Sequence, residues 1–199
     1  MLFLDEFPEF ARSALEALRE PLESGLITIV RASQRCEFPA RFQLVAAMNP
    51  CPCGYLGASA PACRCTPAQI ARYQAKLSGP LLDRIDLHVQ VPALPAADLL
   101  HAPPGESSAT IRARCAAARE RARQRQHSAS APESKAPFQL APAAAEWLQT
   151  AATRLAWSAR STQRVLKIAR TIADLDHSDM ILTLHVAEAM HYRSAINLP

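Results

Sequence analysis

A short apolar segment that ends in two acids constrains the fold of this chain more than any other feature. Leu2 to Leu4 has the hydrophobicity and length of a buried strand, and Asp5 and Glu6 follow it directly. Ligands bind at the carboxyl ends of strands in parallel α/β sheets, so paired carboxylates there predict a binding edge. Taken alone, the pattern also fits a strand end that caps a following helix. Pro8 suits the first turn of that helix.

Further strand patterns predict a sheet. Residues 43–48 indicate a strand that is buried on both faces and ends at Asn49. Residues 26–30 and 37–42 flank a polar stretch, which predicts a hairpin, and residues 85–91 predict another strand. The first half of the chain is therefore predicted to be a parallel α/β unit.

Helix signals occupy the remaining segments. The helix after Pro8 is expected to end at Pro21 and Gly25, and Thr66 is expected to cap a helix that begins at Pro67. Ser107 or Ser108 can cap a helix whose predicted apolar stripe is Ile111, Cys115, Ala118 and Ala122. Helices are also predicted over residues 142–156 and 183–194, with a third between them that buries Val165, Ile168, Ala169 and Ile172.

The polar strand ends match the requirements of nucleoside triphosphate hydrolysis. An acid such as Asp5 can hold hydrated magnesium while the next acid, Glu6, orients the attacking water, which is the Walker B arrangement. The amide of Asn49 can hold the same water beside the γ-phosphate, the role called sensor 1. These three residues are the candidate catalytic groups at the sheet edge.

Arginines provide candidate contacts to the nucleotide. Arg84 precedes the predicted strand of residues 85–91, where it could reach a phosphate bound by a neighbouring subunit; Lys76 is a weaker candidate for this finger role. Arg160 opens a helix, a position that the helix dipole disfavours unless an anion lies nearby. A plain surface arginine is an equally good interpretation of Arg160.

Four cysteines occur within an irregular insert, residues 50–67, that is rich in proline and glycine. Cys51 and Cys53 are separated by nine residues from Cys63 and Cys65. Four thiolates on one short loop can form a structural zinc site, although Cys-x-Cys pairs are less usual than a two-residue spacing. Four free thiols is the alternative. Cys36 and Cys115 are expected in the core.

One segment is strongly basic, although the net charge of the whole chain is only +4. This segment contains six arginines and a single acid, Glu120. The arginines are Arg112, Arg114, Arg119, Arg121, Arg123 and Arg125. A polyanionic partner and a solvated helix face are both consistent with this pattern. Residues 127–137 are polar and predict a flexible link.

Composition places the chain among soluble globular proteins of one or two compact units, since 49% of its 199 residues are hydrophobic and 20% are charged. Apolar runs are all far shorter than the roughly 20 residues that span a bilayer, and the first residues do not form a signal peptide. These features predict a cytoplasmic protein without a membrane partner. Its cysteines are then expected to be reduced.

Four segments in this order resemble the ComM/YifB group of magnesium-chelatase-like AAA+ ATPases. They are Leu-Phe-Leu-Asp-Glu-Phe-Pro-Glu-Phe, Pro-Ala-Arg-Phe-Gln-Leu-Val-Ala-Ala-Met-Asn-Pro, Leu-Ser-Gly-Pro-Leu-Leu-Asp-Arg and Ala-Arg-Thr-Ile-Ala-Asp-Leu. The resemblance implies that Asp5 and Glu6 are Walker B, Asn49 is sensor 1, Arg84 is the finger and Arg160 is the sensor 2 arginine of the lid. Arg164 is the second candidate for the lid role. Hexameric sister subunits, ATP, Mg²⁺ and DNA branch migration are implied in the same way.

The phosphate-binding loop of this family, Gly-x-x-x-x-Gly-Lys-Ser/Thr, does not occur in these 199 residues. We therefore expect the C-terminal portion of a longer ATPase, from a truncated or mis-started gene, that is inactive alone and exposes apolar strand faces. The expected organisation is a partial AAA+ core lacking its phosphate-loop strand (residues 1–95), a basic helix and link (96–137) and an all-α lid (138–199).

Two other functions stay open on the sequence. One is a non-catalytic module that binds zinc and nucleic acid or a sister AAA+ subunit. The other is the motor subunit of a magnesium chelatase, which the cysteine insert and the Ala-Arg-Thr-Ile-Ala-Asp-Leu helix make less favoured.

Overall fold

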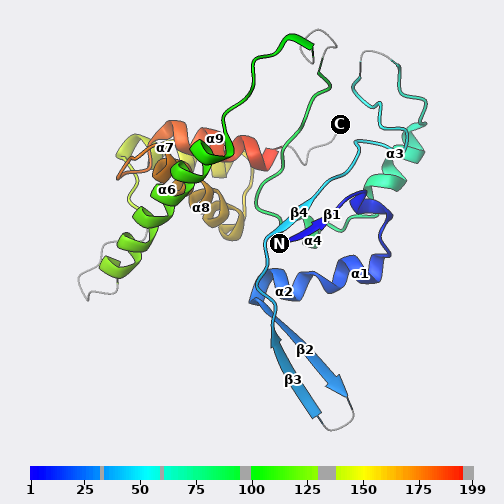
Figure 1. Cartoon of the computed structure of the whole chain (residues 1–199), viewed down its shortest axis with the longest axis horizontal. Coiled ribbons are helices and arrows are strands. Elements are labelled where there is room, and N and C mark those ends of the chain that lie inside the picture. The colour runs from blue at the N-terminus through cyan, green and yellow to red at the C-terminus, as the bar shows by residue number, and fades with distance from the viewer. Residues whose placement is uncertain (32–33, 59–60, 95–99, 130–137, 195–199) are drawn as a thin grey trace. The chain divides into compact units, whose positions relative to one another are not determined.

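Two short strands that are far apart in the sequence pair in parallel and organise the first of two structural units. β1 (Leu2–Leu4) pairs with β4 (Leu44–Ala46) in the computed structural model (Figure 1). The structure describes residues 1–31, 34–58, 61–94, 100–129 and 138–194. The first unit comprises Met1–Ile85, and the second begins at Asp86.

Short helices pack beside the strand pair in the first unit. They are η1 (Phe7–Glu9), α1 (Arg12–Ala17), α2 (Arg19–Ser24), α3 (Pro67–Gln74) and α4 (Gly79–Leu82). Phe7, Leu15, Leu77 and Leu81 form the core of this unit, and all four are nearly fully buried. Contacts between the segment that follows β1 and the segment around α4 therefore hold the unit together.

The helix predicted after Pro8 is divided into three pieces, and the prediction that Pro21 ends it is wrong. Pro21 lies in the first turn of α2, where backbone amides have no partner within the helix and a proline costs little. Gly25 does end the helix, in the left-handed conformation with φ of 71°. The predicted cap of α3 is confirmed, because Thr66 and Gln69 form a reciprocal capping box.

A hairpin follows α2, as the sequence predicts. β2 (Leu26–Arg31) and β3 (Gln34–Pro39) pair antiparallel, with Leu26 opposite Pro39, and extend away from the β1–β4 pair (Figure 1). Every residue of β3 is exposed, including Cys36. The expectation that Cys36 lies in the core is therefore wrong, because β3 is exposed along its whole length.

Two strand predictions need correction. β4 is shorter than predicted and only partly buried, and its Val45 lies beside the exposed Phe3 of β1. Apolar strand faces are thus exposed, as expected. Residues 85–91 form no strand: Leu87, Val89 and Val91 are exposed. The Ile85 amide donates to the Leu82 carbonyl at 3.1 Å and the His88 amide donates to the Tyr192 carbonyl at 2.9 Å, and neither bond is to a strand.

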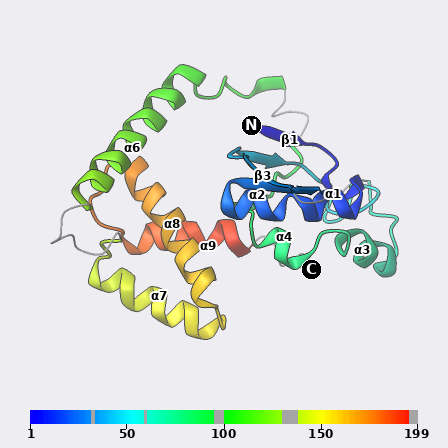
Figure 2. The same cartoon turned by 90° about the horizontal axis from the view of Figure 1, so that it is seen from below.

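The second unit is helical (Figure 2). It contains α6 (Ser108–Ala129), α7 (Pro142–Arg154), α8 (Ala159–Leu175) and α9 (Thr183–Ser194). The predicted face of α8 is confirmed, because Val165, Ile168, Ala169 and Ile172 are buried against α7 and α9. None of the helices in the described residues is long and apolar enough to cross a membrane.

The predicted apolar stripe of α6 is mostly not buried. Ser107 caps it as expected, accepting from the Thr110 amide at 3.1 Å. Of the predicted stripe only Ala118 is buried, and Cys115 is exposed, so its assignment to the core is wrong. The physical reason is that ion pairs hold α6 to α8, as described below. The helix continues to Ala129, and the rest of the predicted link, residues 130–137, lies outside the described residues.

A complete Schellman motif ends α7. The amide of Trp157 donates to the Ala152 carbonyl at 3.0 Å, the amide of Ala156 donates to Thr153, and Ala156 itself is left-handed with φ of 49°. Glycine normally occupies this position, because a Cβ atom makes the left-handed conformation costly by about 1 kcal/mol.

We expect Ala156→Gly to raise the free energy of unfolding of the helical unit by about 1 kcal/mol, because it removes this conformational cost. The matched control is Ala145→Gly in α7 itself, which should lower the same free energy by about 1 kcal/mol. Urea titration followed by tryptophan fluorescence measures both, since Trp147 and Trp157 are the two tryptophans of the chain. A destabilised Ala156→Gly variant would contradict the assignment of this cap.

Candidate functional site

Because β1 and β4 are parallel, the segments that carry the predicted catalytic residues leave the sheet at the same end, after the last residue of each strand. Leu4 lies opposite Ala46, and the amide of Ala47 donates to the Leu4 carbonyl at 2.9 Å. The chain stays in register beyond the strands, since the Phe7 amide donates to the Ala47 carbonyl at 2.9 Å. Asp5 and Glu6 therefore leave the sheet at the same end as the segment that leads to Asn49.

Glu6 has an unusual backbone conformation. It lies in the left-handed region, with φ of 49° and ψ of 44°, and forms the N-cap of η1. Its amide donates to the Asp5 carboxylate at 2.9 Å, and both side chains are exposed. A non-glycine residue in this region costs of order 1 kcal/mol and is typical of sites where a side chain must be aimed. The two carboxylates are thus accessible and held in a defined relation to each other.

Tyr73 links this edge to the loop after β4, and the sequence analysis did not identify it. Its side chain is buried, and the Asn49 backbone hydrogen-bonds its hydroxyl oxygen. Burial, and then the negative charge of Glu9, raise the pKa of Tyr73. The lone aromatic residue of α3 was the available sequence signal. Tyr73 therefore lies beside the Asn49 backbone, and a Cβ atom added at Gly54 would lie 3.8 Å from the Asn49 side chain.

The predicted finger, Arg84, is engaged within its own unit. It donates to the Pro80 carbonyl at 2.7 Å and pairs with Glu23, and its side chain is 13% exposed. Lys76, the weaker candidate, pairs with Glu9 at 2.9 Å. The ion pairs that the structure gives to Arg84 and Lys76 do not involve Asp5 or Glu6.

The two lid candidates belong to the second unit. Arg160 is exposed in the first turn of α8, where Ser158 caps the helix by accepting from the Ser161 amide at 3.2 Å. Arg164 is 15% exposed and lies 3.6 Å from the Asp86 carboxylate. Their roles toward a nucleotide, like those of Asp5, Glu6, Asn49 and Arg84, stay predictions.

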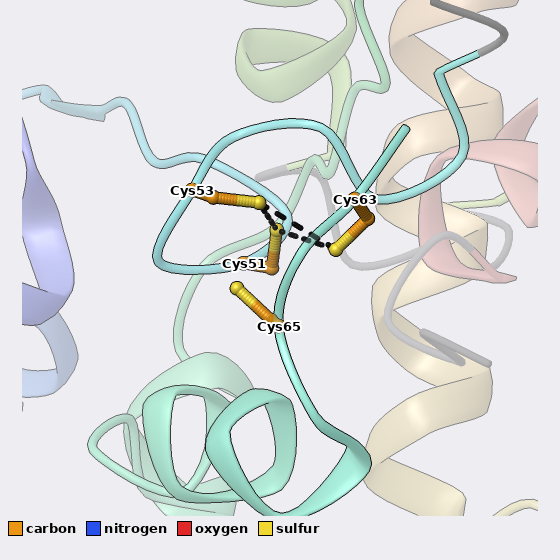
Figure 3. Close-up of side chains that lie close together, drawn as sticks. All are labelled: Cys51, Cys53, Cys63 and Cys65. Atoms are coloured by element: carbon orange, nitrogen blue, oxygen red, sulfur yellow. Dashed lines mark hydrogen bonds between the residues drawn. The ribbon is translucent and has the colours of Figure 1, made fainter. Parts of the chain in front are cut away.

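The four insert cysteines converge on one point (Figure 3). All four sulfurs lie within 4.8 Å of one another, and Cys51 lies 3.4 Å from Cys53 and 3.7 Å from Cys63. Four sulfurs at about 2.3 Å from one zinc ion would be roughly 3.8 Å apart, so the spacing fits tetrahedral coordination. Cys51 is fully buried. The cluster could bind a metal such as zinc, and Cys36 and Cys115 lie outside it.

The loop supports the cluster with backbone groups. Gly54 has φ of 81°, and its amide donates to the Cys51 carbonyl at 3.0 Å, which turns the chain between the first two cysteines. Backbone amides of Tyr55 and Arg64 bond the Cys53 sulfur and lower the pKa of Cys53 to about 6. Burial, and then a hydrogen bond with Cys53, raise the pKa of Cys65 to about 12. A bound cation would favour loss of the protons from the remaining thiols, because metals bind thiolates.

The Ala-Arg-Thr-Ile-Ala-Asp-Leu segment is structural. Arg170 and Asp174 are both about 95% buried and form an ion pair at 3.1 Å. Arg170 also donates to the Asp179 carbonyl at 2.7 Å, and Asp174 accepts two bonds of 2.7 Å from Arg125 of α6. This cluster fixes α6 and the turn after α8 to the core of the helical unit.

Two protein-family models match this chain. A model described as magnesium chelatase, subunit ChlI matches residues 1–99, and one described as magnesium chelatase, subunit ChlI C-terminal matches residues 105–193. The chain belongs to the magnesium chelatase ChlI family. Membership of this family implies an AAA+ fold with ATP and Mg²⁺. The small parallel sheet and the helical second unit agree with this class of fold.

Within this family, YifB of Escherichia coli is 49% identical over 199 residues and aligns with 98% of this chain. Competence protein ComM of Haemophilus influenzae is 46% identical over 204 residues and aligns with the whole chain. Protein Rv2897c of Mycobacterium tuberculosis is 43% identical over 201 residues and aligns with 97% of the chain. The chain spans 39–40% of the length of these relatives, in their C-terminal part.

We expect the purified chain to bind one zinc ion through the cysteine cluster. Cys51→Ser should abolish stoichiometric binding, because it removes the buried sulfur, whereas Cys115→Ser should bind like the unmodified chain. Elemental analysis gives the metal content, and cobalt substitution reports tetrahedral thiolate coordination by its visible absorption. Equal metal content in the two variants would show that the cluster is not the site.

Proposed function

We propose that this chain supplies the magnesium- and water-handling side of an ATPase site in a ComM/YifB-like AAA+ protein, whose whole activity is ATP-driven remodelling of DNA. Asp5 holds magnesium, Glu6 orients the attacking water and Asn49 holds that water beside the γ-phosphate. Magnesium, when bound, neutralises charge on the phosphates. Arg84 acts as a finger toward a sister subunit of a hexamer, and Arg160, or Arg164 as second candidate, contacts the nucleotide from the lid.

The observation that carries this proposal is that the carboxyl ends of β1 and β4 lie side by side. Parallel pairing with Leu4 opposite Ala46 supports a common location for Asp5, Glu6 and Asn49 beyond the carboxyl ends of the two strands. The exposed carboxylates leave room for a hydrated ion, and Glu6 has a left-handed backbone conformation of the kind found where a side chain must be aimed. A pair of acids that only capped a helix would not require this conformation.

The nucleotide site needs a phosphate loop from residues other than these. The 199 residues contain no such motif, while the relatives are more than twice as long. Family membership supports ATP as the ligand, and the name competence protein, carried by the ComM relative, supports a DNA-directed role. A cytoplasmic location is part of the same proposal.

The cysteine cluster favours a second candidate function, a non-catalytic module that binds zinc together with nucleic acid or a sister AAA+ subunit. The family description favours the third candidate, the motor subunit of a magnesium chelatase. The non-catalytic module predicts no ATP hydrolysis in any variant. The chelatase motor predicts hydrolysis that Glu6→Gln lowers but that DNA does not stimulate.

We expect the chain alone to hydrolyse no ATP above background. Fusing it to the part of Escherichia coli YifB that precedes the aligned region should restore magnesium-dependent hydrolysis that DNA stimulates. In that chimera, Glu6→Gln should lower the rate by roughly 100-fold or more, because the neutral amide orients water poorly. Glu20→Gln, a change at an exposed acid of α2, is the matched control and should leave the rate unchanged. An active Glu6→Gln chimera, or clear turnover by the chain alone, would contradict the assignment.

A further inference from the structure

The arginines of α6 form two rows on opposite faces of the helix. Arg114, Arg121 and Arg125 are spaced by seven and four residues, and Arg112, Arg119 and Arg123 repeat this spacing two residues earlier. At 3.6 residues per turn, each row stays within about 20° of one line, and the two rows lie about 200° apart. We call the first set the inner row and the second set the outer row.

The inner row is neutralised by acids of the same unit. Arg114 forms a bidentate pair with Glu106 at 2.9 and 3.0 Å. Arg121 pairs with Asp179 at 2.7 Å and also donates to the His177 carbonyl. Arg125 forms a bidentate pair with the buried Asp174. The bonds of Arg121 and Arg125 account for the attachment of α6 beside α8, which Figure 2 shows.

Among the described residues, the outer row has no comparable set of acids. All three of its arginines are exposed, and the single acid of α6 is Glu120. Glu120 lies 3.9 Å from Arg123, and both side chains are more than half exposed, so this pair contributes little. The helix therefore turns a balanced face to its own unit and an excess of positive charge to the other side.

We propose that the outer row of α6 binds the phosphate backbone of nucleic acid. Guanidinium groups match phosphate oxygens in a bidentate way. The row spans 11 residues of helix, about 16 Å, which equals the rise of several nucleotides of one strand at about 3.4 Å each. This surface deepens the proposed DNA-directed activity by naming where the chain contacts its substrate.

A lipid surface fits α6 less well than nucleic acid. Helices that lie on membranes bury large apolar side chains opposite their basic face. The face opposite the outer row instead carries the paired arginines of the inner row, and Ile111 is the single large aliphatic side chain of α6. Because the outer row would contact phosphates, its recognition would be electrostatic and independent of base sequence.

The test measures binding of the full chain to a fluorescein-labelled single strand and to the corresponding duplex, without ATP, over a series of salt concentrations. The test variant carries Arg112→Gln, Arg119→Gln and Arg123→Gln. The control carries Arg31→Gln, Arg154→Gln and Lys167→Gln, which removes the same charge from exposed positions elsewhere. A third variant with lysine at the three outer positions keeps the charge.

Each phosphate contact contributes about 0.9 to the slope of log K against log salt for duplex DNA, so the test variant should lose roughly 2.7 from that slope. Raising salt from about 50 to about 200 mM should then weaken binding of the unmodified chain roughly 40-fold more than binding of the test variant. We expect the control to lose less than 1 from the slope and the lysine variant to keep most of it.

Binding to phosphatidylserine vesicles and to polyglutamate is measured in parallel. The proposal would be overturned by equal slopes for the test variant and the control, or by no binding of DNA by the unmodified chain. It would also be overturned if the test variant lost binding to the vesicles or to polyglutamate but bound DNA as well as the unmodified chain does. Circular dichroism and tryptophan fluorescence establish that the variants are folded. Because ATP is absent, failure here leaves the role of Glu6 untouched, and an inactive Glu6 site leaves this result untouched.

Discussion

The parallel pairing of β1 with β4 is the interaction on which the candidate site depends. These strands are separated by about forty residues that contain η1, α1, α2 and the β2–β3 hairpin. A two-stranded pair has little stability of its own, so its geometry must be maintained by the packing of Phe7, Leu15, Leu77 and Leu81 beside it. Those side chains come from the segment that follows the two acids and from the segment that precedes Arg84. The core of the unit therefore also sets the directions in which its charged residues leave it.

Sequence reasoning succeeded where a short segment carries its own signal. The capping box of Thr66 and Gln69, the β2–β3 hairpin and the apolar face of α8 each follow from a few neighbouring residues. It failed where the outcome depends on a partner elsewhere. Residues 85–91 have strand composition but pair with no strand among the described residues, and Cys36 and Cys115 lie on elements whose faces are uncovered. Composition indicates that a residue can be buried, but only a neighbouring element buries it.

The roles of the α6 arginines also depend on partners elsewhere in the chain, which the sequence does not identify. Arg125, Arg121 and Arg123 are alike in the sequence, yet the first pairs with a buried acid, the second with an exposed one, and the third belongs to the outer row. The motif that contains Arg170 and Asp174 carried part of the family resemblance, and its structural role became apparent only from the pairing with α6. Predicting these roles requires knowing which acids fold back onto the helix, and Asp174 lies 49 residues from Arg125.

The cysteine cluster and the sheet edge are mechanically connected. Cys51 follows Asn49 by two residues, and Tyr73 of α3 hydrogen-bonds the Asn49 backbone while α3 itself begins two residues after Cys65. A metal held by all four sulfurs would therefore fix both ends of the loop that begins two residues after Asn49. Such a closed set of four thiolates leaves no open coordination position, which is the property of structural sites and not of catalytic ones. Under the proposed function, the cysteine cluster would support the position of Asn49 by ordering the loop that follows it.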